Sequence, residues 1–144
     1  MSTISADFID GASRAPGFRK VRWDGRQPVD IETLDMLIAR HGMPAFCKID
    51  VEGAEAAILA GLSHPIQTVA FEYVPPMREV ALGAIDRLAS LAPYRFNRVV
   101  GESNRWVTTS WCDAASMRQQ ILDLADDAQS GDIYATRDAQ GLRR

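Results

Sequence analysis

The sequence has few of the residues that mark metal-binding, disulfide-bonded or secreted proteins. Its two cysteines, Cys47 and Cys112, form no CxxC pair and have no histidine at the spacing of a metal site, so we expect free thiols. Its two histidines, His41 and His64, each precede a glycine or proline at the end of an element, and we expect them to be solvated. No run approaches about 18 apolar residues, and the opening MSTISADFID lacks a secretory pattern. We expect a soluble, cytoplasmic protein without a membrane partner.

The sequence also has no large excess of positive or negative charge. The net charge is -3 and the isoelectric point is near 5.3, so the chain has no broad attraction for nucleic acid and we expect no such partner. What the sequence does contain is 47% hydrophobic and 24% charged residues in a length of 144. This balance fits one globular domain with a core, or a sizeable part of a larger one.

Apolar segments alternate between strand and helix patterns along the chain. Two prolines and three glycines interrupt residues 11–28, which we interpret as a loop or lid after a short helical turn over Ala6–Gly11. The patterns that follow predict strands at Ala45–Val51, Ile66–Tyr73, Tyr94–Val99 and Asp132–Thr136, and helices at Leu34–His41, Gly53–Ala60, Met77–Leu91 and from the Asp113 cap to about Ala125. This alternation predicts an α/β fold with a parallel sheet and helices on both faces.

Acidic residues follow the first two of these predicted strands. The segment KIDVEGAEAAILAG begins at Lys48 and places Asp50 and Glu52 at the end of the first strand, while Glu72 lies at the end of the second. Ligands of parallel sheets bind beyond the carboxyl ends of the strands. If the two strands are neighbours, the carboxylates converge. Asp50 is the strongest functional candidate, because Asp is a poor strand former and Gly53 permits a turn that brings backbone amides to a ligand.

The same residues have structural interpretations. Glu52 and Glu55 lie at the start of a helix, where the helix dipole favours negative charge. Lys48 lies within a strand, so we expect an internal ion pair, with Glu55 or Glu72 as its partner.

The stretch TLDMLIARHGMPAFCKIDVEGAEAAILAGL, followed by VAFEY, resembles the FkbM family of S-adenosylmethionine-dependent methyltransferases. The residues that match in order and spacing are Thr33, Leu34, Asp35, Lys48, Ile49, Asp50, Val51, Glu52, Gly53, Glu55, Leu59, Gly61, Phe71 and Glu72. The resemblance extends more loosely over about Ser2–Thr136. It implies a partial Rossmann-like class I methyltransferase sheet, mostly parallel, with helices on both faces and SGDIYA as a final antiparallel strand.

The resemblance also implies an activity and a site. The reaction would be methyl transfer from S-adenosylmethionine to a small-molecule acceptor, a hydroxyl group on a sugar or secondary metabolite. The implied catalytic residues are Asp50 and Glu72, and the implied cofactor-binding residues are Asp50, Val51 and Glu52. No GxGxG follows a strand, although such a loop holds the cofactor in these enzymes. We therefore expect residues 1–144 to be one truncated domain, the C-terminal half of such an enzyme, that binds the cofactor weakly or not at all by itself.

Two other functions remain open. The chain could be a non-catalytic interaction module or a split-enzyme subunit, in which the open edge of the Ala45–Val51 strand pairs with a second copy or with a complementary N-terminal half. Alternatively, Asp50, Glu52 and Glu72 could hold a divalent cation in a hydrolase or a metal-dependent methyltransferase. This is the least favoured alternative, because no histidine or asparagine supports the carboxylates, and we expect no metal.

Overall fold

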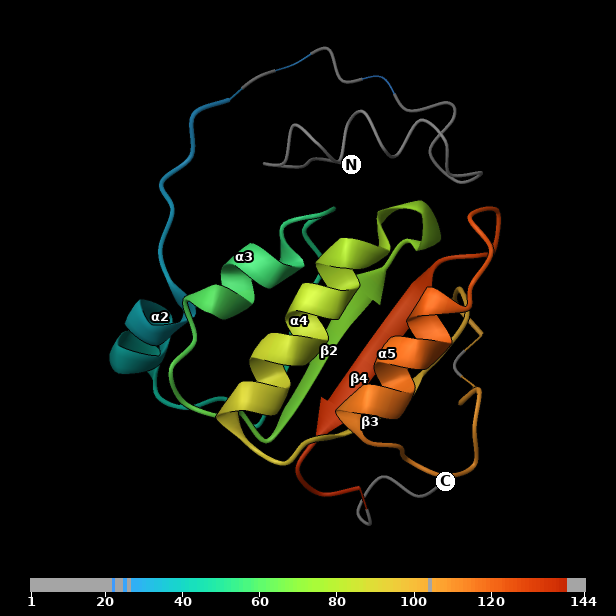
Figure 1. The fold of residues 1–144 in the computed structure, drawn as a ribbon. Coiled ribbons are helices and arrows are strands. Elements are labelled where there is room, and N and C mark those ends of the chain that lie inside the picture. Colours follow the sequence, from blue (N-terminus) through green and yellow to red (C-terminus); the bar gives the residue numbers. More distant parts are fainter. Residues whose placement is uncertain (1–21, 23–24, 26, 104, 140–144) are drawn as a thin grey trace.

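Four strands form one sheet in the computed structural model of the chain, which describes residues 22, 25, 27–103 and 105–139 (Figure 1). The strands are β1 (Phe46–Ile49), β2 (Thr68–Tyr73), β3 (Arg95–Arg98) and β4 (Gly131–Thr136). All four predicted strands are present, with ends within two residues of the prediction. Their order across the sheet is β1-β2-β4-β3, so β1 and β2 are neighbours, as the convergence of their acidic residues requires.

The helices also lie close to their predicted positions. They are α2 (Leu34–His41), α3 (Glu55–Ala60), the 3-10 turn η1 (Pro75–Met77), α4 (Arg78–Leu91) and α5 (Ala114–Leu122). Two predicted caps are confirmed. Thr33 Oγ1 accepts a hydrogen bond of 3.2 Å from the Met36 amide at the start of α2, and Asp113 accepts one of 2.9 Å from the Ser116 amide at the start of α5.

The prediction of a mostly parallel sheet is wrong. Among the strands that the structure describes, only β1 and β2 pair in parallel, because β4 lies between β2 and β3 and runs antiparallel to both. The cause is the segment after β3, which runs back along that strand through antiparallel bridges that pair Val99 with Trp106 and Phe96 with Cys112. This return brings the chain back to the starting end of the sheet before α5 begins. The helix then carries it to the opposite end, so the next strand can only run in the reverse direction.

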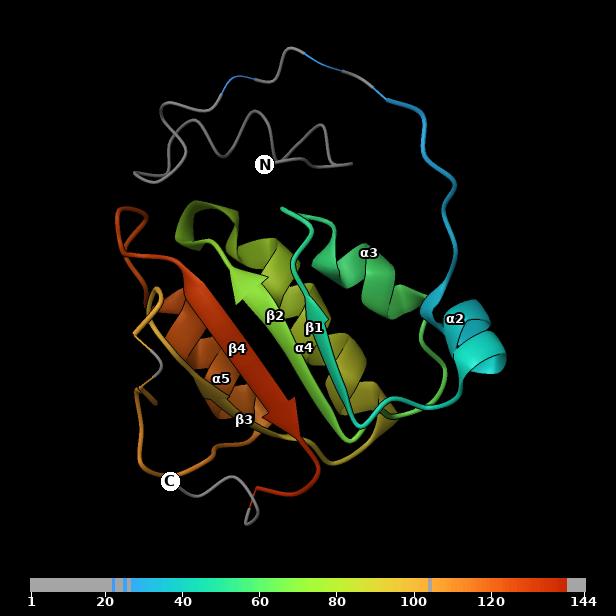
Figure 2. The ribbon, with the colours of Figure 1, turned by 180° about the vertical axis from the view of Figure 1, so that it is seen from behind.

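Helices α3, α4 and α5 lie together on one face of the sheet (Figures 1 and 2), which corrects the prediction of helices on both faces for the part of the chain that the structure describes. The strand order explains this arrangement. The connections from β1 to β2 and from β2 to β3 advance in the same direction across the sheet, and right-handed crossovers in one direction place their helices on one face.

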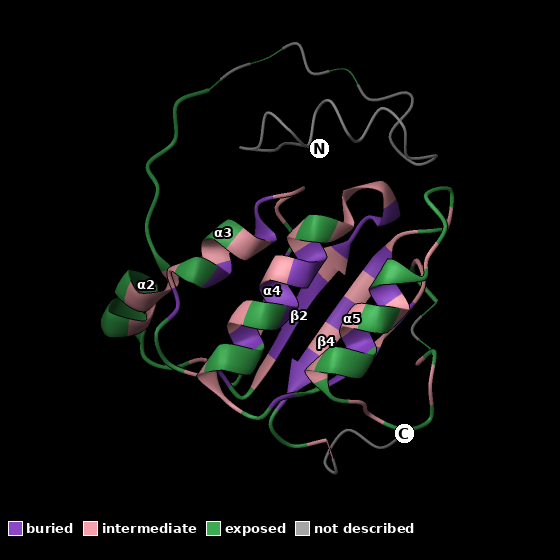
Figure 3. Ribbon diagram, viewed as in Figure 1, coloured by how far each residue is buried: buried purple, intermediate pink, exposed green. Residues whose placement is uncertain are grey.

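The core lies between this helical layer and the sheet (Figure 3). Alternate residues of the strands point into it, because successive side chains in a strand face opposite sides. The buried sheet residues on this side are Ile49, Val69, Phe71, Tyr73, Phe96, Ile133 and Ala135. Lys48, Glu72, Asp132 and Tyr134 alternate with these core residues and belong to the opposite face.

Most of the predicted loop at 11–28 and the predicted helical turn at Ala6–Gly11 lie outside the described residues. Among the helices that the structure does describe, none has the length and apolar character needed to cross a bilayer.

Candidate active site

Three carboxylates meet at the carboxyl ends of β1 and β2. Asp50 and Glu52 follow β1, and Glu72 lies in β2, which runs parallel to β1 with Ile49 opposite Phe71. One carboxylate oxygen from each of the three residues lies within 4.8 Å of the others. The predicted convergence is therefore confirmed. These oxygens are of the type that could hold a hard divalent cation, although exposed acidic groups are common without one.

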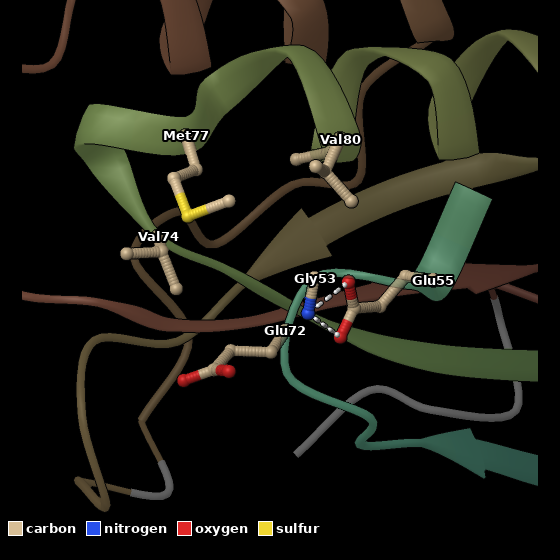
Figure 4. Close-up of a pocket in the computed structure, with 7 residues that line it drawn as sticks. Gly53, Glu55, Glu72, Val74, Met77 and Val80 are labelled. Carbon is tan, nitrogen blue, oxygen red and sulfur yellow. Dashed lines mark hydrogen bonds between the residues drawn. The ribbon is translucent and has the colours of Figure 1, made fainter. Parts of the chain in front are cut away.

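A tight turn positions the first two of these residues. Glu52 has a φ of 54° and Gly53 a φ of 96°, so both adopt the left-handed conformation that is unfavourable for a residue with a side chain such as Glu52. The buried carboxylate of Glu55 stabilises the turn. It accepts hydrogen bonds from the Gly53 amide at 3.3 and 3.1 Å (Figure 4). It also accepts one from the Val51 amide at 3.4 Å. These two amides thus point to Glu55 instead of to an incoming ligand.

Lys48 makes ion pairs that the sequence did not predict. Its Nζ lies 3.2 Å from Asp132 Oδ2 and 3.4 Å from Asp50 Oδ2, so the expected pairing with Glu55 or Glu72 is wrong. The register explains the difference. Lys48 stands opposite the small side chain of Ala70 on β2, and its own side chain extends over that residue to β4. Glu55 is unavailable because it is bonded to the turn.

The ionisable groups of Glu72, Glu52 and Lys48 have shifted pKa values. Burial raises the pKa of Glu72 from 4.5 to about 8, and repulsion from Glu52 and Asp50 adds to the rise. Burial also raises the pKa of Glu52, with further contributions from Asp50 and Glu55. Burial alone would lower the pKa of Lys48, but its contacts with Asp132 and Asp50 raise it. At neutral pH, Glu72 is therefore mostly protonated, beside an ion pair between Lys48 and Asp50.

A shallow pocket borders this cluster. It is lined by Gly53, Glu55, Glu72, Val74, Met77, Val80 and Ala81. Figure 4 shows the Glu72 carboxyl group pointing away from Met77 and Val80, which agrees with its place on the face of the sheet opposite the helices. The pocket therefore has an apolar wall on the side of the helices, while the Glu72 carboxyl group can exchange its proton on the opposite face of the sheet.

Sequence reasoning missed two parts of this region, Asp132 and a group of aromatic side chains. The ring of Trp106 lies 5.1 Å from that of Trp111 and 5.0 Å from that of Tyr134. The alternation of side chains along the GDIYAT strand places Asp132 and Tyr134 on one face, and this pattern could have indicated that the two residues act together. The position of β4 beside β2 was still needed to bring Asp132 to the site. His41 and His64 are exposed, as predicted.

A family model described as the Methyltransferase FkbM domain matches residues 3–102 of the chain. This match spans more than half of the 144 residues and includes the three clustered carboxylates and the Glu55 turn. No curated protein matches the chain.

Proposed function

The chain belongs to the FkbM methyltransferase family, and from this premise we propose that it transfers a methyl group from S-adenosylmethionine to a hydroxyl group of a sugar or secondary metabolite. The observation that carries the proposal is the meeting of Asp50, Glu52 and Glu72 at the carboxyl ends of two adjacent parallel strands. That is where sheets of this class bind their ligands.

The acidic cluster fits the proposed methyl donor. S-adenosylmethionine, when bound, supplies a methyl group on a positively charged sulfur. Burial is the main cause of the raised pKa values of Glu52 and Glu72, and repulsion from neighbouring carboxylates adds to it. A cation nearby would relieve this repulsion. Asp50 and Glu52 are the proposed charged contacts of the cofactor. Val51 would contribute through its side chain or carbonyl group, because its amide is bonded to Glu55.

Glu72 is the proposed general base. S-adenosylmethionine, when bound, would supply the methyl group and keep the electron pair of its carbon-sulfur bond, and the Glu72 carboxylate would take the proton that the acceptor hydroxyl group loses. A base is most effective when its pKa lies near the working pH, and that of Glu72 is about 8. Asp50, whose Oδ2 lies 3.4 Å from Lys48 Nζ, is placed to accept a hydrogen bond from the acceptor hydroxyl and orient it.

Calorimetric titration with S-adenosylmethionine at pH 6.5 and pH 9 tests this function. We expect weak binding overall, because the sequence contains no GxGxG loop. We also expect the affinity to rise at least threefold at pH 9, since ionised Glu72 attracts the cation. S-adenosylhomocysteine, which has a neutral sulfur, is the matched ligand control and should show a smaller rise. The Glu72→Gln variant should lose the difference between the two ligands, and equal pH dependence for both in the wild type would refute the proposal.

A second candidate function, pairing through the sheet edge, has an observation of its own. Within the described sheet β1 pairs only with β2, and its Phe46 is 51% exposed, close in sequence to Met43 at 49%. An apolar edge strand favours association with another strand. Light scattering after size exclusion should then reveal a dimer that Phe46→Lys dissociates, with Leu122→Lys on α5 as the control for loss of an exposed apolar residue. A wild-type monomer would exclude self-pairing.

A further inference from the structure

The face of the sheet opposite the helices carries an aromatic surface. Tyr134 alternates along β4 with Ile133 and Ala135, which lie in the core, so its ring belongs to the other face. Trp106 meets this ring nearly edge to face, at 88°, and it also contacts Trp111. All three residues are partly exposed. In Figure 2 no described helix covers the sheet on this side.

Hydrogen-bonding groups adjoin these rings. Asp132 lies two residues before Tyr134 on the same face, and it pairs in register with Glu72. Lys48 Nζ donates to Asp132 from the neighbouring strand at 3.2 Å. Lys48 stands opposite Ala70 on β2, and Ala70 stands opposite Tyr134 on β4, so Lys48 lies in the same row of the sheet as the Tyr134 ring. The aromatic surface therefore has an acceptor and a donor at its border.

We propose that Trp106, Tyr134 and Asp132 form an acceptor subsite that takes a cyclic polyol, with the apolar face of the ring against the aromatic side chains and its hydroxyl groups bonded to Asp132 and Lys48. The inference rests on the proposed function. It adds a binding place for the part of the acceptor that does not react. Residues two apart in a strand are separated by about 7 Å. A ring seated on Tyr134 thus lies one such step from the Asp132 and Glu72 pair, and can present a hydroxyl group to Glu72.

The chemistry of the surface selects for a ring. Aromatic faces are negative and attract the weakly positive hydrogens of a C–H-rich surface, which a polyol ring presents on one side while its hydroxyl groups point outward. An open-chain polyol offers the same hydroxyl groups but must lose more conformational freedom to bind. The subsite should therefore discriminate between the two by shape, and binding energy from this contact would orient the reacting hydroxyl group.

The test is a titration followed by nitrogen-15 NMR of the tryptophan indole groups, with the cofactor left out. The probes are methyl β-D-glucopyranoside and the open-chain polyol sorbitol. We expect the glucoside to shift the Trp106 indole signal in a saturable manner, with sorbitol binding at least fivefold more weakly. Asp132→Asn should weaken glucoside binding at least fivefold. Phe46→Leu alters another exposed aromatic residue of the sheet, and it should leave the affinity within twofold of wild type.

Three results would overturn the subsite: no saturable shift, equal affinity for the two probes, or unchanged affinity in Asp132→Asn. Trp106→Leu should also abolish binding, and because its ring packs between two others, its fold is checked by amide dispersion. If that variant unfolds, Asp132→Asn still decides the question. Glucoside binding in a chain that never binds S-adenosylmethionine would support the subsite and refute methyl transfer by this chain alone. The reverse pattern would refute the subsite alone.

Discussion

Replacing Glu72 by glutamine should remove much of the pH dependence of folding. The pKa of Glu72 is raised from 4.5 to about 8, so the folded chain holds this proton more tightly than the unfolded chain. The resulting stability is fully present below about pH 4.5 and is lost as the pH rises through about 8. A shift of one pKa unit corresponds to about 1.4 kcal/mol for a fully buried group. Because part of the Glu72 side chain remains in contact with water, we discount this to about 0.7 kcal/mol per unit.

The wild-type chain should then lose about 1.5 kcal/mol of unfolding free energy from this group between pH 6 and pH 9. Glu72→Gln keeps the shape of the side chain and cannot ionise. Between the two pH values, the variant should therefore lose about 1.5 kcal/mol less unfolding free energy than the wild type. Urea denaturation followed by circular dichroism at the two pH values measures the difference. Glu79→Gln, on an exposed residue of α4, is the matched control and should track the wild type. If Glu72→Gln loses as much stability as the wild type, the assigned protonation of Glu72 is wrong.

Two further predictions concern the frame of the site. Glu55→Ala leaves the amides of Val51 and Gly53 without their acceptor, so the free energy of unfolding in urea should fall by about 2 to 3 kcal/mol. Glu79→Ala, in the first turn of α4, should lower it by less than about 1 kcal/mol, and equal losses would contradict the role given to Glu55. Gly131→Ala would place a methyl group 2.2 Å from the carbonyl oxygen of Val99, and we expect a loss of about 3 kcal/mol. Gly25→Ala, where no described residue lies within 4 Å of the added methyl group, should change stability by less than about 0.5 kcal/mol. A similarly small effect at Gly131 would show that β3 and β4 do not approach so closely.

The features that the sequence predicted correctly depend on local signals. Thr33 and Asp113 cap their helices because an oxygen at that position reaches the free amide three residues on. The four strands follow from short apolar runs bounded by turn residues. Even the meeting of Asp50 with Glu72 is nearly local, since one crossover connects two neighbouring parallel strands and only the adjacency of those strands had to be assumed.

The features that were missed depend on residues far apart in the sequence. Lys48 pairs with Asp132, which is 84 positions away, because β4 inserts beside β2, and no pattern within either segment encodes that insertion. The role of Glu55 was missed for a different reason. A glutamate in the first turn of a helix is explained well enough by the helix dipole, and only the left-handed conformations of Glu52 and Gly53 turn two amides toward its carboxylate.

The acidic cluster combines features that are unfavourable for the stability of a folded chain. Glu72 keeps a proton in the neutral range, Glu52 adopts a left-handed backbone conformation, and both lie beside Asp50. Local departures of this kind are typical of functional sites. A cation bound here would be attracted by all three carboxylates, and it would stabilise the folded chain by an amount that grows with the ratio of its concentration to its dissociation constant. Because proton and cation compete for Glu72, each should weaken the binding of the other. If the proposed methyl donor binds here, its binding is therefore coupled to folding and protonation through one carboxyl group.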